Sequence, residues 1–315
     1  MPRRVAKAFS PAGISSFFEI CDRTADGQPI ADLEHVGSRG GGFGLQKGVW
    51  TTVYASEAKT TSIRIYINEK LAPEAETTKT TLQMLLSKAE GSYDVVVEHE
   101  VEVPIGAGFG TSAGGALTAG LALSKALELP LTFNQIGKIA HVAEIRCKTG
   151  LGTVGPLMIS GCVLTVEPGA PGVSVIDRIP LSPDYVVVAG VFGSTPTRQV
   201  LASAEHRRLV NRYGRKTLEA ILAEPTLESF LACCWDFAEK AGFATERVKQ
   251  LVCLAEEAGA VGAVQNMVGE AVHAVAHEEN AERVAEAFKK LLPNEKILVA
   301  KIDLQGARLV EHEKV

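Results

Sequence analysis

The sequence lacks the features that would indicate a structural metal site or an oxidised, secreted protein. Its six cysteines lie between residues 21 and 253, and none belongs to a CxxC pair. Structural zinc sites usually rely on such closely spaced ligands. The cysteines are therefore interpreted as small buried side chains in a reducing compartment, and we expect the protein to be cytoplasmic.

Long apolar runs and an excess of positive charge are also absent. No run approaches the roughly 18 apolar residues of a membrane-spanning helix, and the basic segment at residues 1–13 lacks the apolar core of a signal peptide. The formal net charge is -5, and a surface of that overall sign does not attract nucleic acid. We therefore expect no membrane partner and no nucleic-acid partner.

What the chain does contain is enough apolar side chain for a large core, since 46% of its 315 residues are hydrophobic and 22% are charged. Alternating or β-branched segments predict strands at residues 49–57, 62–68, 93–103, 163–167, 185–192, 271–276 and 296–302. Helical patterns predict helices at residues 77–89, 114–127, 133–147, 197–211, 213–223, 227–241, 245–258 and 281–292.

This order of elements predicts an α+β fold in which helices cover one face of a mainly antiparallel sheet. The turn sequence PGAPG at residues 168–172 separates a strand-rich first part from a more helical second part. We therefore predict two domains, at residues 1–172 and 173–315.

The strongest chemical signal is a glycine-rich loop between a strand and a helix, VPIGAGFGTSAGGALTAG at residues 103–120. Gly106, Gly108 and Gly110 can adopt positive φ angles, and they place no side chain between the backbone N–H groups and an anion. The following helix adds unpaired N–H groups and the positive end of its dipole. We predict that this loop binds phosphate groups, with the hydroxyls of Thr111 and Ser112 beside it.

The glycine spacing differs from two common nucleotide motifs. No Gly-Lys-[Ser/Thr] sequence follows, so the loop is not a Walker A motif. The spacing and the lack of a following acidic residue also differ from the dinucleotide-binding fingerprint. The remaining alternative is a tight turn before a closely packed helix. The combination of strand, loop, two hydroxyls and small-residue helix favours phosphate binding over that alternative.

Four segments together resemble one enzyme superfamily. PIGAGFGTSAGGAL at residues 104–117 resembles the second conserved motif of the GHMP kinases, and its FGTSAGGAL part is similar to archaeal pantoate kinases. FSPAGISSFFEI at residues 9–20, VGSRGGGFGLQKGV at 36–49 and AHVAEIRCKTGLG at 140–152 resemble the same group. The resemblance implies the two-domain GHMP kinase fold, with an N-terminal domain like the second domain of ribosomal protein S5 and an α+β C-terminal domain.

The resemblance also implies a small-molecule kinase. The implied reaction is ATP-dependent phosphorylation of the hydroxyl of pantoate to 4-phosphopantoate in coenzyme A biosynthesis, with Mg²⁺ as cofactor. Two alternatives stay open: a GHMP kinase acting on another small alcohol or sugar, and a nucleotide-binding regulatory relative without catalysis. The third superfamily motif, expected at residues 258–272, lacks its tight glycine cluster. A homodimer is expected as the commonest assembly.

Individual residues follow from the same resemblance. Ser112, Glu144 and Thr153 are implied to be catalytic, and Ser112 and Glu144 to hold magnesium, which prefers hard oxygen ligands. The alternative for Glu144 is a surface residue paired with Lys148 at i+4. Thr153 replaces an aspartate that is usual at this place, so a side-chain base is missing there. The residues expected to bind ATP are Pro104, Gly106, Gly108, Gly110, Thr111, Ser112 and Ala113.

The acceptor carries a carboxylate and hydroxyls of its own. The resemblance points to Ser38 and Thr197 as acceptor-binding residues. Arg39 and Arg198 follow them in sequence, and we expect them to bind the carboxylate because guanidinium groups form paired bonds to it. His273 and His277 are four residues apart and could share a metal on a helix, but their alternating pattern favours a strand. A strand would separate the two side chains by about 13 Å, which argues against a shared metal.

Overall fold

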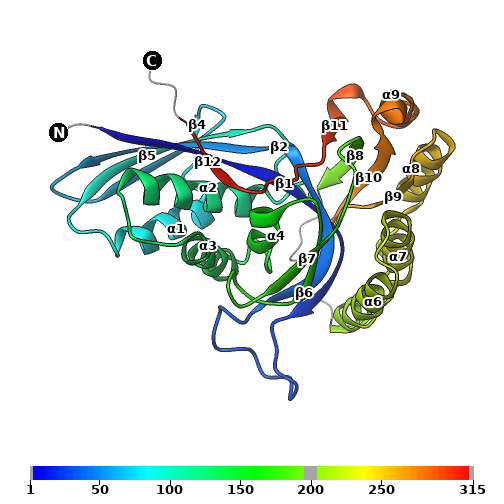
Figure 1. Cartoon of the computed structure of the whole chain (residues 1–315), viewed down its shortest axis with the longest axis horizontal. Coiled ribbons are helices and arrows are strands. Elements are labelled where there is room, and N and C mark those ends of the chain that lie inside the picture. Colours follow the sequence, from blue (N-terminus) through cyan, green and yellow to red (C-terminus); the bar gives the residue numbers. More distant parts are fainter. Residues whose placement is uncertain (1–2, 195–203, 312–315) are drawn as a thin grey trace.

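The computed structural model describes residues 3–194 and 204–311 and contains two β-sheets flanked by helices (Figure 1). The first sheet has eight strands, with the path β12-β1-β2-β5-β3-β4, and β6 and β7 continue from β2. Its strands are β1 (Arg4–Cys21), β2 (Gly37–Glu57), β3 (Ser62–Ile67), β4 (Lys70–Leu71), β5 (Tyr93–Val101), β6 (Cys162–Glu167), β7 (Val175–Ile179) and β12 (Arg308–Val310).

Four helices accompany the first sheet. They are α1 (Glu76–Leu86), α2 (Thr111–Ala126), α3 (Phe133–Cys147) and α4 (Val154–Ile159). Helix α2 packs on β1 and β2 and is covered by α1 and α3, so it is buried on nearly all sides. A helix in such a place must be apolar all round, which explains why its sequence consists mainly of Gly, Ala and Leu.

The second sheet has four strands in the order β11-β8-β10-β9. The strands are β8 (Tyr185–Ser194), β9 (Gly262–Gln265), β10 (Gly269–His277) and β11 (Ile297–Lys301). The helices of this part are α6 (Ala204–Ala223), α7 (Leu227–Lys240), α8 (Glu246–Glu257) and α9 (Ala281–Phe288). The predicted α+β class is confirmed. Every strand pair between these elements is antiparallel except β3–β5.

Strands β1 and β2 connect the two parts of the molecule. They pair from Arg4↔Ala55 to Cys21↔Gly37, with register shifts that bend the ladder near Ser15. One half of β1 packs on α2, and the other half contacts α6 and α7. Aromatic side chains from both parts meet here, with the ring centroids of Phe43 and Phe230 5.3 Å apart. The core is therefore continuous from one sheet to the other.

The structure corrects the predicted helices at residues 197–211 and 213–223. Residues 204–223 form one continuous helix, α6, and residues 197–203 lie outside the described part. Gly214 does not break the helix. It allows α6 to approach β1, because an added Cβ would lie 2.1 Å from the carbonyl oxygen of Phe18. Asn211 completes the contact by bonding both the N–H (2.9 Å) and the C=O (3.1 Å) of Ile20.

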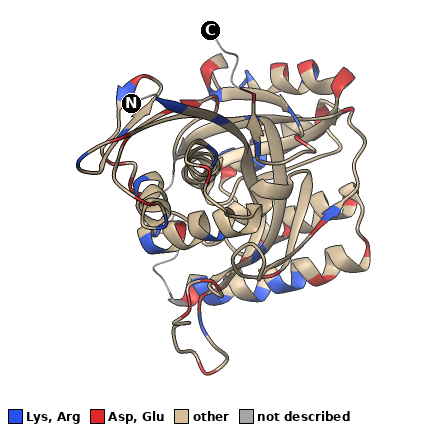
Figure 2. Cartoon of the chain, turned by 60° about the vertical axis from the view of Figure 1, so that its left-hand side comes forward, with Lys and Arg blue, Asp and Glu red and all other residues tan. Residues whose placement is uncertain are grey.

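The predicted domain boundary at residue 172 stays a prediction. Strand β7 lies after it and yet pairs with β6, and β12 returns to pair with β1, so the first sheet takes strands from both sides. None of the helices in the described ranges is long and apolar enough to span a membrane. Acidic and basic residues are interspersed along the helices, loops and strand ends (Figure 2).

Candidate active site

The glycine-rich loop has the backbone conformation that its sequence predicts. Gly106, Gly108 and Gly110 have φ angles of 78°, 82° and 64°, in the left-handed region that glycine adopts without strain. Gly110 occupies the N-cap position of α2. The N–H of Gly13 in β1 donates to the carbonyl oxygen of Phe109 at 3.1 Å. The loop is thus held against β1 at the start of α2.

A cleft of about 290 Å³ opens in front of this loop. Residues from five separate segments line it: Gly13, Ser15, Phe18, Ser38, Ile105, Gly106, Gly108, Phe109, Gly110, Thr111, Ser112, Ala113, Glu144, Thr149, Gly150, Leu151, Thr153, Met267 and Val268. Most of the predicted site residues are therefore brought together, although they are up to 115 positions apart in sequence between Ser38 and Thr153. Pro104 precedes the loop and is not among the lining residues.

Glu144 is the only ionisable side chain among these lining residues. It projects from α3 and is 2% exposed, which excludes the interpretation as a surface residue paired with Lys148. Its Oε2 accepts a hydrogen bond from the N–H of Thr153 at 3.2 Å. Desolvation raises the pKa of Glu144 to about 7, and the N–H groups of Thr153 and Gly152 act in the opposite direction. Among the described residues that line the cleft, none is a cationic neighbour of this buried carboxylate.

Thr153 lies at the N-cap position of α4. Its side chain makes no capping hydrogen bond to that helix, so the hydroxyl is not needed for the helix end. Thr153 lines the cleft and also a smaller adjoining cavity. It therefore stands where the two spaces meet.

The smaller cavity has a volume of about 60 Å³, and the part of its wall that the structure describes contains no charged side chain. Hydroxyls come from Ser15, Ser38, Thr153 and Thr165. The remaining wall is apolar or glycine, formed by Gly13, Ile14, Phe17, Phe18, Gly40, Gly41, Gly42, Phe43, Gly44, Gly152, Pro156, Leu157 and Val163. A small molecule with an apolar body and hydroxyl groups suits this surface.

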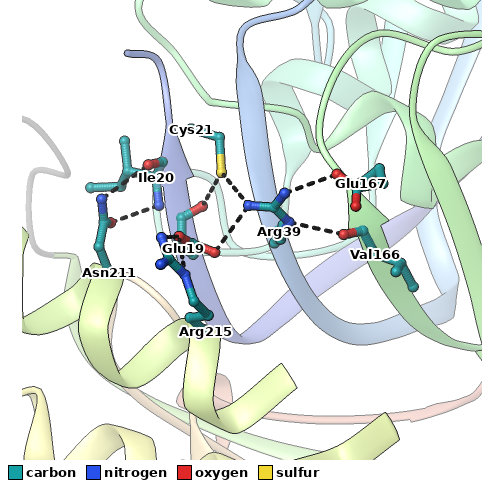
Figure 3. Close-up of polar contacts among 8 residues, drawn as sticks. All are labelled: Glu19, Ile20, Cys21, Arg39, Val166, Glu167, Asn211 and Arg215. Atoms are coloured by element: carbon teal, nitrogen blue, oxygen red, sulfur yellow. Dashed lines mark hydrogen bonds and ion pairs between the residues drawn. The ribbon is translucent and has the colours of Figure 1, made fainter. Parts of the chain in front are cut away.

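Arg39 does not reach either space, although Ser38 lines both. Its Nε donates to the carbonyl oxygen of Val166 at 3.0 Å, and its Nη atoms bond Glu167 at 2.9 Å and Glu19 at 3.3 Å (Figure 3). Consecutive residues of a strand point to opposite faces, which explains the separation from Ser38. The expectation that Arg39 contacts the acceptor carboxylate is therefore not met.

The buried carboxylate of Glu19 also binds Arg215 of α6, with Nη2 2.6 Å from Oε1. Glu19 thus joins two arginines and fixes α6 to β1 and β2. Thr197 and Arg198, the other two predicted acceptor-binding residues, lie outside the described residues.

Several lining residues were not singled out from the sequence. The segment at residues 9–20, which resembles the first superfamily motif, contributes Gly13, Ser15 and Phe18. The segment at 258–272, where the third motif is expected, contributes Met267 and Val268. The sequence indicates both segments, but which of their residues face the cleft depends on the bend in β1 and on the turn between β9 and β10. No local sequence signal could have identified them.

Comparison with known proteins agrees with this geometry. The family model described as "GHMP kinases N terminal domain" matches residues 76–160. The chain is 32% identical to the pantoate kinase of Thermococcus kodakarensis over 292 residues, which is 90% of this chain and 92% of that protein. The chain belongs to the GHMP kinases. This GHMP kinase is also 28% identical to the pantoate kinase of Methanocaldococcus jannaschii, over 89% of its own length and 96% of that protein.

A solved structure supports the same assignment. A protein described as "Phosphotransferase related to CoA biosynthesis pathway" is similar to this kinase with a TM-score of 0.83 and 29% sequence identity. The match covers 97% of this chain and 98% of that one. The glycine-rich loop and Glu144 both lie within residues 76–160, so the family match includes the centre of the cleft.

Proposed function

We propose that this GHMP kinase transfers the terminal phosphoryl group of ATP to the hydroxyl of pantoate and forms 4-phosphopantoate for coenzyme A biosynthesis. One observation carries the proposal: a glycine-rich loop, a buried carboxylate and a small cavity with several hydroxyls in its wall share one cleft. The similarity to pantoate kinases over about nine tenths of the chain supports this acceptor.

The phosphates of ATP would lie at the loop, where Gly106, Gly108 and Gly110 leave the backbone accessible and α2 directs its N-terminus at the cleft. A further cavity is lined by Thr111 and Ser112 and has both apolar and polar walls. The apolar side chains include Val49, Ile67, Leu71, Ala72 and Ile105, and the polar ones include Lys70, Glu74, Glu76 and His99. We assign the nucleoside to this cavity, because a base stacks well against apolar side chains.

Ser112 and Glu144 fit a magnesium ion. Glu144 is buried with a raised pKa, and no basic side chain occurs among the described residues that line the cleft, so a divalent cation would supply positive charge there. No cluster of three or more His, Cys, Asp or Glu side chains that could hold a metal occurs in the ranges that the structure describes. Magnesium needs only one or two protein ligands, because water and phosphate oxygens fill the rest of its coordination shell. When bound, it would neutralise charge on the transferring phosphoryl group.

The acceptor would occupy the smaller cavity, with Ser38 beside it. The apolar walls suit the dimethyl carbon of pantoate, and the hydroxyls of Ser15, Ser38 and Thr153 can bond its oxygens. Thr197 and Arg198 are proposed as further acceptor-binding residues on sequence grounds alone. Arg198 would bind the acceptor carboxylate.

The reaction does not need a side-chain base. A threonine hydroxyl has no pKa suited to accepting a proton at neutral pH, and the described lining of the smaller cavity contains no carboxylate. Bond formation to the attacking oxygen lags in a loose phosphoryl-transfer transition state. The acceptor proton therefore leaves late, to the transferred phosphoryl group or to water, while Thr153 orients the acceptor.

Replacement of Thr153 by valine tests this mechanism. Thr153→Val keeps the shape and removes the hydroxyl, so we expect a loss of less than about tenfold in kcat, the worth of one ordinary hydrogen bond. Initial rates at saturating ATP and pantoate measure it. A loss of a thousandfold or more in a folded variant would show that Thr153 takes a direct part in the chemistry.

An acceptor panel tests the function itself. ADP release is measured with pantoate, pantothenate, mevalonate and homoserine, and we expect pantoate to give the highest kcat/KM. Preference for another member of the panel would identify a different GHMP kinase. Nucleotide binding without turnover on any acceptor would identify a regulatory protein. A cytoplasmic homodimer of archaeal type remains our expectation from the sequence, and light scattering tests the dimer.

A further inference from the structure

A chain of three buried polar side chains lies directly behind the cleft. Ser16 of β1, Asn266 in the β9–β10 turn and His273 of β10 are each 0% exposed. The Oγ of Ser16 lies 2.9 Å from Nε2 of His273, and Nδ1 of His273 lies 2.7 Å from Oδ1 of Asn266. Desolvation lowers the pKa of His273 to about 3, so the ring is neutral. It donates through one nitrogen and accepts through the other.

The same stretch of β1 touches both sides of the cleft. Gly13 holds the phosphate loop through its N–H bond to Phe109. Two residues later, the carbonyl oxygen of Ser15 accepts a hydrogen bond from the N–H of Met267 at 2.7 Å. Ser16 then bonds His273. Residues 13–16 of β1 therefore join the loop of the first sheet to the β9–β10 turn of the second.

The β9–β10 turn stands close against the phosphate loop. Met267 and Val268 line the cleft. A Cβ added to Gly108 would lie 3.6 Å from the Cβ of Asn266 and 3.6 Å from the carbonyl oxygen of Met267. A displacement of the turn would therefore open space beside Gly108, where the loop backbone is to meet the phosphates.

Polar side chains at this place carry a cost. The Nδ2 of Asn266 is buried and has no hydrogen-bond partner within the described part of the chain, and a buried amide group without a partner is destabilising. Apolar side chains could fill the same volume, because the ring of His273 already packs against the ring of Phe43. The centroids of the two rings are 5.7 Å apart. What apolar packing cannot supply is the fixed direction that hydrogen bonds impose.

We propose that His273, together with Ser16 and Asn266, is a positioning residue for nucleotide binding, because it holds the Met267–Val268 turn against the phosphate loop. None of the three is among the residues that line the cleft. They act through Met267 and Gly108, which do line it. The inference rests on the proposed nucleotide site, but it does not depend on the identity of the acceptor.

The test compares nucleotide affinity in four variants of the full chain by calorimetry with ATP and no acceptor. His273→Phe keeps a ring against Phe43 and removes both hydrogen bonds, and we expect ATP to bind about tenfold more weakly or worse. Ser16→Ala removes one bond, for an expected loss of about fivefold. His273→Gln keeps a polar end and should retain more affinity than His273→Phe.

The matched control is Ser124→Ala on α2, because Ser124 is also buried and its hydroxyl has no partner in the described structure. We expect this variant to bind ATP as the parent does. In steady-state assays the KM for ATP should rise in His273→Phe and Ser16→Ala, because loss of uniform binding to the nucleotide raises the KM for the nucleotide. The KM for pantoate should stay within about twofold of the parent's value.

The outcomes distinguish a failure of the positioning role from a failure of the proposed function. Undiminished ATP affinity in both His273→Phe and Ser16→Ala would overturn the positioning role and leave the proposed function intact. Equal weakening toward ATP and pantoate would overturn it too, since that pattern indicates general loosening. A parent protein that binds no ATP would instead contradict the proposed function. If His273→Phe does not fold, Ser16→Ala against Ser124→Ala decides.

Discussion

Glu144→Gln is expected to lower turnover about a hundredfold or more, because it removes the carboxylate that we propose holds the magnesium ion stabilising charge in the transition state. The amide keeps the size of the side chain and an oxygen that can accept from the N–H of Thr153, which now lies 3.2 Å from Oε2. The loss should therefore appear in kcat with the fold unchanged. Initial rates at saturating ATP, pantoate and magnesium measure it.

The control is Glu246→Gln on α8, whose exposed carboxylate forms an ion pair with Lys249. It should leave kcat at the parent's value. A Glu144→Gln variant with activity close to that of the parent would rule out a charge or metal role for this residue. Restoration of its activity by raised magnesium alone would locate the defect in metal affinity.

The stability of Glu144→Gln should change in the opposite sense to its activity. Burial raises the pKa of Glu144 from 4.5 to about 7, so between those values the folded state binds a proton that the unfolded state has released. The free energy of unfolding contributed by this group therefore falls as pH rises through that window. The metal-free parent should be destabilised at pH 8 relative to Glu144→Gln, by up to about 3 kcal/mol.

Urea unfolding of both proteins without magnesium at pH 5 and pH 8 measures this difference. Near pH 5 the folded carboxyl is protonated whereas the unfolded one is already largely ionised, but only a small part of the window up to about 7 has been crossed. The two proteins should therefore differ much less at pH 5 than at pH 8. Added magnesium and ATP should stabilise the parent at pH 8 more than the variant, since binding to the folded state adds to stability. Equal unfolding curves at both pH values would mean that the carboxylate is better solvated than its burial indicates.

Gly110→Val is expected to abolish measurable nucleotide binding. Gly110 has a φ angle of 64°, which a β-branched residue adopts only with strain. Its added Cβ would also lie 3.0 Å from Cγ2 of Thr153 and 3.3 Å from the carbonyl oxygen of Gly13. The start of α2 would have to shift away from the phosphates. Calorimetry with ATP measures the loss, and circular dichroism shows whether the fold survives.

Gly91→Val separates backbone strain from damage to the site. Gly91 has a φ angle of 91°, and nothing lies within 4 Å of its added Cβ. It precedes β5 and is not among the residues that line the cleft. This variant should lose stability and keep its affinity for ATP. Undiminished ATP affinity in Gly110→Val would show that the phosphates do not approach the loop at this glycine.

Arg39 shows where reasoning from the sequence ended. Its place next to Ser38 and its paired donors favoured a contact with the acceptor carboxylate, but the strand directs it to the opposite face, where Glu19 and Glu167 bind it. For Glu144, by contrast, the tertiary structure brings the side chain into the cleft and buries it. Its burial, which distinguishes it from an ordinary helix-surface glutamate, arises from the loop at residues 149–153 folding over α3.

The sequence by itself predicted the α+β class, many of the helices and strands and the conformation of the glycine-rich loop, because periodicity and glycine conformation are local properties. It did not predict β1 (Arg4–Cys21) or the first part of β2, which connect the two parts of the molecule. Tertiary structure decided which residues reach the cleft. The β9–β10 turn joins the site only because Met267 bonds Ser15, more than 250 positions earlier in the chain. The side chains of Ser38 and Arg39 lie on opposite faces of the same strand. Such relations depend on strand register and long-range packing, which no short stretch of sequence contains.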